Sequence, residues 1–244
     1  MALGAFDAQG RLVGLAFSFI GLDEHGDEQV LRHHSHMLAV LPEYRSHKLG
    51  ALLKFKQREI ALAQGIELVT WTYDPLLALN ANLNLVRLGS IARRYHPNAY
   101  GEMTDGLNAG LDSDRFEVEW WLNAPRVRQC ATGEPRRASW DELKRQGAQE
   151  IFDITWDAQA LPHVAREHEL HAKRALMDIP IDLGAVKLGS LELAREWRAR
   201  TRHCLEFAFV HGYAAVDFVF KHAERPRAAY VLSNEPLDLG STHA

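Results

Sequence analysis

The segment from Met37 to Gly65 constrains the fold most, because an apolar run stops at Pro42, passes through a basic turn and resumes as a helix. From Gly50 to Ala63 apolar residues recur near helical spacing with polar residues between them, which predicts an amphipathic helix. Predicted strands precede it, over 29–41, and follow it, over 66–73. This order predicts a parallel pair of strands joined by a right-handed crossover, with any ligand at their carboxyl ends.

The rest of the chain supplies further elements on both sides of this unit. Residues 10–22 predict a strand and residues 23–28 a polar hairpin loop, while Asp74 and Pro75 are suited to open a helix over 76–89. Strands are predicted over 90–103 and 114–122, separated by a loop over 104–113. The polar stretch 123–139 predicts a boundary, beyond which we expect a helix over about 158–176, a strand near 177–182, a helix over 190–211 and strands over 213–220 and 228–233.

These patterns predict an α/β protein with a mixed α+β sheet, divided into a core over 1–124 and a smaller α+β region over 125–244 that packs on or completes it. With 244 residues and 47% hydrophobic content, the chain can bury a substantial core. The apolar runs are shorter than the roughly 20 residues of a membrane span, and no signal peptide is evident, so a cytoplasmic protein is expected. The net charge of −4 argues against general nucleic-acid binding. Cys130 and Cys204 form no recognisable disulfide or metal spacing.

The basic turn has two interpretations, an ordinary solvated loop or an anion site. The first N–H groups of a helix lack partners and the helix dipole favours negative charge there, so the turn and the helix start together suit a diphosphate. Arg45, His47 and Lys48 add donors.

The stretch "LAVLPEYRSHKLGALL" resembles the acyl-CoA binding motif of the GNAT superfamily of N-acyltransferases, in which Arg or Gln, two residues, Gly, one residue and Gly or Ala follow one another. Arg45 and Gly50 match this motif, whereas Lys48 stands at its first glycine. The order of elements from Arg11 to Leu122 is also similar, and segments such as "WTYDPL", "RRYHPNAYGEM" and "HGYAAVDFV" resemble a bacterial branch of predicted GNAT acyltransferases with an added C-terminal region.

The resemblance implies acetyl-CoA or another acyl-CoA as co-substrate and assigns residues to it. The pantetheine arm would lie along the strand end formed by Leu38, Ala39 and Val40. The pyrophosphate would lie on the backbone amides of Ser46, His47, Lys48, Leu49, Gly50 and Ala51, with charge from Arg45 and Lys48. Asn80 and Asn84 would lie beside the lower part of CoA.

Two departures from the family accompany these assignments. The tyrosine that many members use to protonate the leaving thiolate falls at Leu85. The chain also begins near the second strand of the family's fold, without the first strand and the helices that usually shape the acceptor site. We expect a later segment or a partner chain of a homodimer to supply that wall, unless the sequence is truncated at its start.

Candidate catalytic groups follow from the need to deprotonate the attacking amine. By alternation His34, His36, Leu38 and Val40 share one face of their strand, which makes His36 the first choice of base and His34 the second. Hydrogen-bonded structural histidines are the alternative, and without a third ligand no metal site is predicted. Tyr100 is a candidate acid or a tyrosine with its ring in the core, and Arg115 is a candidate acceptor-binding residue or a partner of Asp114.

The sequence therefore predicts a CoA-dependent N-acyltransferase that moves acetyl, succinyl or another short acyl group to the amine of a small metabolite such as an amino acid. Catalysis would rest on proximity, on backbone donors that polarise the thioester and on base assistance. The alternatives are a catalytically weak acyl-CoA binding or sensing protein and a purely structural interaction module.

Overall fold

The computed structural model describes residues 1–25, 28–101, 110–134 and 138–240. The strands of the described residues are β1 (Ala2–Phe6), β2 (Leu12–His25), β3 (Glu28–Val40), β4 (Leu68–Tyr73), β5 (Ile91–His96), β6 (Arg115–Trp121), β7 (Gln149–Glu150), β8 (Phe152–Trp156), β9 (Pro162–Glu167), β10 (Arg174–Ile179), β11 (Ala214–Lys221) and β12 (Arg227–Ser233). The helical segments are the 3₁₀ turn η1 (Pro42–His47), α1 (Leu49–Ala63), α2 (Ala78–Ala81), the π-helical η2 (Asn82–Arg87), α3 (Pro125–Ala131), α4 (Trp140–Arg145), α5 (Leu183–Gly189) and α6 (Leu191–Val210).

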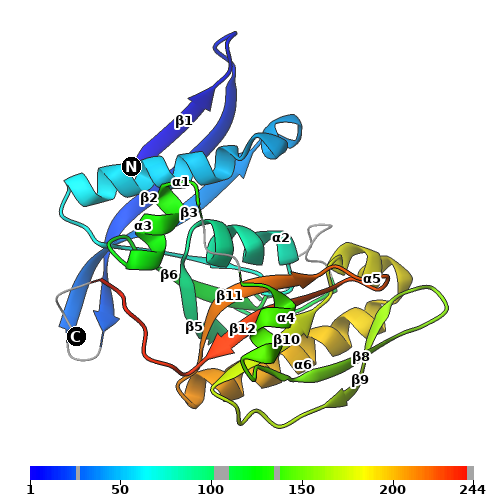
Figure 1. Cartoon of the computed structure of the whole chain (residues 1–244). Helices are drawn as coiled ribbons and strands as arrows, with labels where there is room; N and C mark the ends of the chain where they lie inside the picture. The colour runs from blue at the N-terminus through cyan, green and yellow to red at the C-terminus, as the bar shows by residue number, and fades with distance from the viewer. Residues whose placement is uncertain (26–27, 102–109, 135–137, 241–244) are drawn as a thin grey trace.

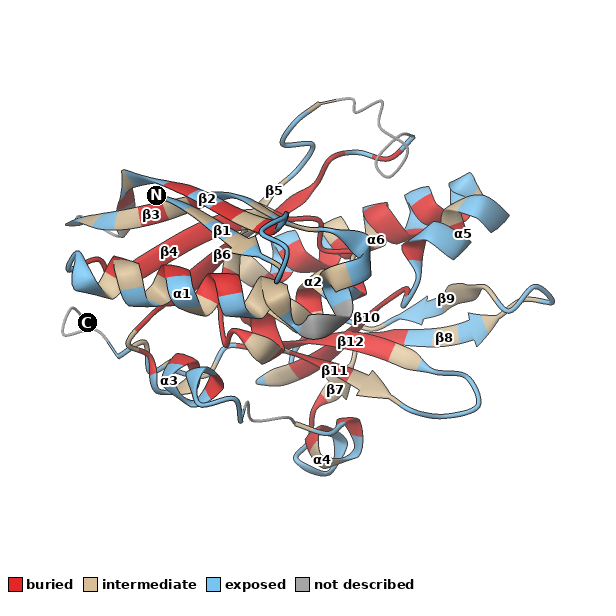
Figure 2. Ribbon diagram, turned by 90° about the horizontal axis from the view of Figure 1, so that it is seen from above, coloured by how far each residue is buried: buried red, intermediate tan, exposed pale blue. Residues whose placement is uncertain are grey.

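One mixed sheet runs through the molecule in the order β1-β2-β3-β4-β6-β5-β11-β12-β10-β7, and β8 pairs only with β9. Helix α1 lies along the N-terminal strands, and α6 lies beside the strands of the C-terminal half (Figures 1 and 2). The mixed α+β sheet predicted from the sequence is thus confirmed. The predicted parallel pair is β3 and β4, joined by α1.

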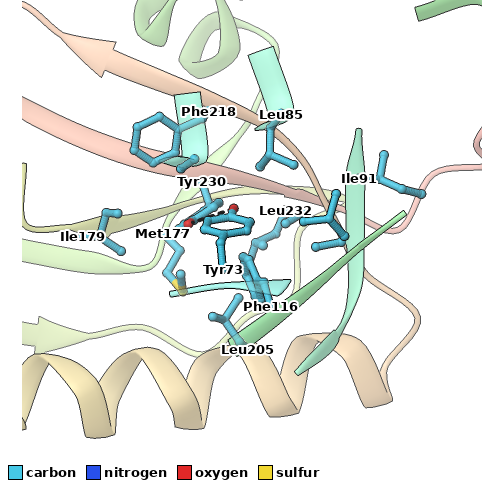
Figure 3. Packing of buried hydrophobic residues seen from close by; sticks show 14 of the residues in the cluster. Tyr73, Leu85, Ile91, Phe116, Met177, Ile179, Leu205, Phe218, Tyr230 and Leu232 are labelled. Carbon is cyan, nitrogen blue, oxygen red and sulfur yellow. Dashed lines mark hydrogen bonds between the residues drawn. The ribbon is translucent and has the colours of Figure 1, made fainter. Parts of the chain in front are cut away.

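The C-terminal strands extend the sheet that the N-terminal strands begin, because β11 pairs with β5 through Ala215 and Ala92. Buried residues of both halves form one cluster, part of which Figure 3 shows. In it the Tyr73 and Tyr230 hydroxyls lie 3.2 Å apart, and the Tyr230 hydroxyl donates to the Pro75 carbonyl at 2.7 Å. The end of β4 is therefore held from the C-terminal half of the chain.

Several predicted elements need correction. The helix expected over 158–176 is wrong, because β9 occupies 162–167 and pairs antiparallel with β8 from Trp156–Pro162 to Phe152–Glu167. Pro162 lies inside the expected helix and argues against it, and pairing with β8 makes the segment a strand. The strand expected over 177–182 lies at 174–179, and β5 ends at His96 instead of reaching 103. Strands β1, β7 and β8 and helices α3, α4 and α5 were not predicted. Residues 104–109 of the expected loop, with 102 and 103 before it, lie outside the described part of the chain.

None of the helices in the described ranges has the length and apolarity that a membrane span requires.

Candidate functional site

Strands β3 and β4 pair over a short stretch and then part. Their parallel ladder holds Arg32 to Leu68, His33 to Val69 and His34 to Thr70. Beyond it β3 continues to Val40, and β4 continues to Tyr73 while remaining paired with β6. We call the region between residues 35–40 and 71–73 the split. The edges that face each other across the split do not satisfy one another, so an extended ligand could pair with them.

A β-bulge in β3 accompanies the split. Phe17 pairs with Met37 and Ser18 pairs with Ser35, which leaves His36 as the extra residue. A bulge bends its strand and interrupts the alternation of side chains. It therefore gives a physical reason for β3 to turn away from β4 just after His34.

The bulge also corrects the predicted faces of β3. His34 and His36 do share a face, since their ring centroids lie 6.4 Å apart and both rings lie near Phe19. Leu38 does not share it, because its Cδ2 lies 3.8 Å from the position that a Cβ on Gly50 of α1 would take. Ser35, whose hydroxyl accepts a hydrogen bond from Lys54 of α1, also faces the helix.

The basic turn leads directly into α1. Residues 42–47 form η1, and Lys48 has φ 57° and ψ 18°, a left-handed conformation that glycine adopts more easily than lysine. Helix α1 has no side-chain cap and no acidic residue in its first turn. Arg45 and Lys48 are exposed, and Arg45 Nε donates to the Val40 carbonyl at 3.2 Å. Apart from its chain neighbours and the backbone of its own helix, the nearest atom to a Cβ placed on Gly50 would be Leu38 Cδ2, at 3.8 Å.

The predicted residues of the next helix occupy α2 and η2. Asn80 is half-buried in α2, whereas Asn84 is buried in η2 and its Oδ1 accepts a hydrogen bond from Trp71 Nε1 at 3.3 Å. Leu85 is buried with only 1% of its surface exposed. Short π-helical segments occur often at functional sites, and this one links Trp71 in the split to the second helix of the unit.

The face of the sheet opposite α1 carries the predicted catalytic histidines. His34 is half-buried, and burial, followed by the positive charges of Arg32 and His36, lowers the pKa of its imidazole. The lowered pKa favours the neutral form of the ring, which is the form that can accept a proton. His36 is exposed at the bulge. Among the described residues, no group of three metal-binding side chains forms around them or elsewhere.

Tyr100 reaches β4 near this place, because its hydroxyl lies 3.0 Å from Thr72 Oγ1. The Arg115 guanidinium lies over the Tyr100 ring, 5.0 Å from its centroid. Arg115 itself is buried, donates to the Asp114 carbonyl at 2.8 Å and lies 4.0 Å from the Asp74 carboxylate. The Asp114 carboxylate is instead held by Arg202. The arginine predicted to hold an acceptor is thus occupied by protein contacts.

A charged network on the same face as His34 was not predicted. Glu117 on β6 accepts hydrogen bonds from Arg32 at 3.3 Å and Arg94 at 3.2 Å through Oε1, and its Oε2 lies 2.7 Å from His96 Nε2. Arg94 also donates to Asp23 at 3.1 Å. A glutamate in the middle of an apolar strand is the signal that sequence reasoning could have used, since a charge there needs a partner.

Lys54 was also missed, because the sequence places it among the polar residues of an amphipathic helix. The residue is 2% exposed. Its Nζ donates to Ser35 Oγ and Gln57 Oε1, both at 2.9 Å, and lies 3.5 Å from the Trp71 ring centroid. Burial lowers the pKa of this amine well below its ordinary value, and no neighbouring carboxylate opposes the shift. Gln57 Nε2 is buried without a hydrogen-bond partner.

Solved structures resemble this chain over about half of its length. Naa20 of Chaetomium thermophilum in complex with a bisubstrate analogue is 16% identical, covers 55% of this chain and 70% of its own, and has a TM-score of 0.42. The ribosomal-protein-S18-alanine N-acetyltransferase from Escherichia coli is 17% identical over 50% of this chain and 68% of its own, with a TM-score of 0.39. Aminoglycoside 6'-acetyltransferase type Ii is 20% identical over 50% and 68%, with a TM-score of 0.36.

The sequence matches no protein-family model and no curated protein. These similarities cover only part of the chain and show what it resembles. A proposal for its activity has to rest on the chemistry of the site.

Proposed function

We propose that the protein is a CoA-dependent N-acyltransferase that moves acetyl, succinyl or another short acyl group to the amine of a small metabolite such as an amino acid. One observation carries the proposal. Strands β3 and β4 part after His34 and Thr70, and the chain that leaves β3 enters α1, a helix without a side-chain cap, through the left-handed Lys48. A ligand with an extended amide-containing arm and a diphosphate matches both parts. The arm would pair with the strand edges, and the diphosphate would lie on the helix N-terminus.

The phosphate end rests on Lys48, Gly50 and Arg45. Helix α1 begins at the left-handed Lys48 without a side-chain cap, so the first N–H groups of the helix would be the donors for phosphate, and Gly50 adds no side chain there. Arg45 and Lys48 add positive charge. This chemistry fits CoA, whose adenosine end carries a diphosphate.

The reacting end rests on His34, the last residue of β3 in the ladder. A thioester lying in the split would meet a neutral imidazole on the face opposite α1. This base would take the proton of the attacking amine, while backbone N–H groups along the split polarise the thioester carbonyl. The open face around Glu117 would receive the amine, and Tyr100 lies at its margin.

Binding is tested first, by isothermal titration of the full chain with CoA. Replacing Arg45 and Lys48 together by Ala should weaken CoA binding at least tenfold, because two cations near the phosphates are removed. Lys56→Ala is the matched control, since Lys56 is exposed on α1 and pairs only with Glu59 in the next turn. Absence of CoA binding to the unchanged protein would refute the proposal.

Turnover is tested by thiol release from acetyl-CoA and succinyl-CoA with a panel of amino acids, polyamines, aminoglycosides and peptide N-termini. Replacing His34 by Gln should lower kcat about 10²-fold and remove the acidic limb of the pH–rate profile. Because the pKa of His34 is lowered, that limb should lie below the ordinary histidine value of about 6.5. CoA binding without turnover on any amine would favour an acyl-CoA sensing protein.

We also propose that two copies associate in the cytoplasm, as expected from the sequence. Strands β2 and β3 expose large apolar side chains to solvent, namely Phe17, Phe19, Ile20, Leu22, Leu31 and Met37. A second copy that covered them could supply the wall of the acceptor site. Light scattering of the purified chain should give twice the monomer mass, and replacement of Phe19 and Ile20 by Ser should restore the monomer.

A further inference from the structure

Lys54 lies where the ladder between β3 and β4 ends. Its partner on β3 is Ser35, which follows the last paired residue His34, and its partner on β4 is Trp71, which follows the last paired residue Thr70. The amine therefore bridges the two strands at the inner end of the split. It reaches that point from α1, the helix whose first turn forms the phosphate site.

Lys54 and His34 flank this point from opposite faces of the sheet. Ser35 and Trp71 face α1, whereas His34 faces the open side with Glu117 and Arg32. A group bound in the split would thus meet an imidazole on one side and an amine on the other. Acyl transfer from a thioester is helped by both functions, because the amine loses a proton and the departing sulfur gains one when it becomes a thiol.

We propose that Lys54 is a catalytic residue that donates a proton to the departing thiolate of CoA, an inference that rests on the proposed function. The acceptor nitrogen bonds to the carbonyl carbon, and its proton passes to His34. The carbon–sulfur bond breaks, and the electron pair left on sulfur takes a proton from the Lys54 ammonium. His34 then loses its proton to solvent and Lys54 regains one, so the step needs no oxidant or reductant.

The surroundings of Lys54 suit this role. Two of its N–H groups are donated to Ser35 Oγ and Gln57 Oε1, and the amine lies over Trp71. Burial lowers the pKa of Lys54, which makes its ammonium a stronger acid than an exposed lysine and closer to a thiol, whose pKa is about 8.5 in cysteine. A thiolate formed beside it would supply the negative charge that the site lacks and would favour the ammonium at that moment.

Other titratable groups on this face are occupied. His33 on β3 lies 3.0 Å from Ser18 Oγ through Nδ1 and 2.7 Å from Gln64 Oε1 through Nε2. The Tyr73 hydroxyl on β4 lies against Tyr230, and Arg58 on α1 donates to the Leu122 carbonyl. Among the described titratable groups of the α1 face, Lys54 is the one that contacts both β3 and β4 where their ladder ends.

The first test needs only CoA binding. The thiol of CoA bound to the full chain is titrated by the ultraviolet absorbance of its thiolate, with free CoA as reference. The bound thiol should ionise at lower pH than free CoA, and Lys54→Met should remove this shift, while Lys56→Met should leave it unchanged. An unshifted thiol in the unchanged protein, or an equal shift in Lys54→Met, would overturn the role of Lys54. Absence of CoA binding would instead refute the proposed function.

The second test uses the leaving group. Lys54→Met should lower kcat with acetyl-CoA about 10²-fold, and the loss should shrink with an acetyl thioester of an acidic aromatic thiol, which departs without protonation. An equal loss with both donors would point to a structural role. Should Lys54→Met fold poorly, as judged by its melting temperature, Lys54→Gln serves for the same comparison.

Discussion

Helices α1 and α6 each bury a basic side chain, and the two side chains differ in their partners. Arg198 of α6 donates to both oxygens of Asp74, at 2.8 and 2.6 Å. Lys54 of α1 has a hydroxyl, an amide oxygen and a tryptophan ring around it, and no carboxylate of the described residues pairs with it. The helix starts differ likewise, since the Ser190 hydroxyl caps α6 and α1 begins uncapped at Lys48. The Arg198 charge and the start of α6 thus have partners within the chain, whereas α1 has groups that suit an anionic ligand.

The largest expected effect comes from removing the buried ion pair between Arg198 and Asp74. Arg198→Met leaves the buried Asp74 carboxylate without its two-bond partner, so the free energy of unfolding should fall by about 3–5 kcal/mol. Urea denaturation measures this change. Arg200→Met is the control, because Arg200 lies nearer the surface, where it pairs with Glu196 in the preceding turn and with Glu167 on β9, and it should cost less than about 1 kcal/mol. Similar losses for both variants would contradict the comparison.

Lys54→Met should have the opposite sign. Because an unpaired buried amine is replaced by an apolar side chain of similar length, stability at pH 7 should rise by about 1 kcal/mol. The pH dependence follows from the lowered pKa of Lys54. Between that pKa and about 10.4 the unfolded chain binds more protons than the folded one, so the stability of the unchanged protein rises with pH. The advantage of Lys54→Met should therefore decrease as pH rises from 7 to 10.

The capped helix start should respond to loss of its cap. Ser190→Ala removes the hydroxyl that accepts from the Leu193 amide at 3.1 Å, and the free energy of unfolding should fall by about 1 kcal/mol. Ser139→Ala at the start of α4 removes the hydroxyl that accepts from the Glu142 amide at 3.1 Å, and a similar loss is expected there. If the free energy of unfolding changed by nearly zero in both variants, the capped and uncapped helix starts would not differ in stability as we expect.

The uncapped start should respond least. Lys48→Gly relieves the left-handed conformation of lysine, which offsets the greater freedom of glycine in the unfolded chain, so stability should change by less than about 1 kcal/mol. Lys56→Gly, in the middle of the same helix, should cost about 1 kcal/mol. An equal loss at both positions would show that Lys48 is not strained. CoA affinity of the same variant tells whether the Lys48 ammonium holds phosphate or keeps it from the backbone.

Local sequence patterns predicted several elements of the N-terminal unit correctly. Pro42 ended β3, the apolar spacing of Gly50 to Ala63 gave α1, and the parallel pair of β3 and β4 followed from the order of elements. The C-terminal half was harder. Residues 162–167 were expected within a helix, although Pro162 interrupts one, and they pair with β8 as a strand. Strand pairing depends on residues that are distant or unpatterned in sequence.

The candidate site divides in the same way. The basic turn and the histidines were visible in the sequence because their chemistry is a property of single side chains and their spacing. The bulge at His36 was not, and it moved Leu38 to the opposite face from the one predicted. Lys54 and Gln57 were assigned to the polar residues of an amphipathic helix, although both are buried.

The sequence by itself therefore determined which elements surround the split and that positive charge lies at the start of α1, since periodicity, proline and glycine act on their own neighbours in the chain. Only the tertiary structure decided that β3 and β4 part after His34 and that the Lys54 amine lies at that point. Burial depends on what packs against a residue from elsewhere, and for Lys54 this is Ser35 and Trp71 on the two strands that part.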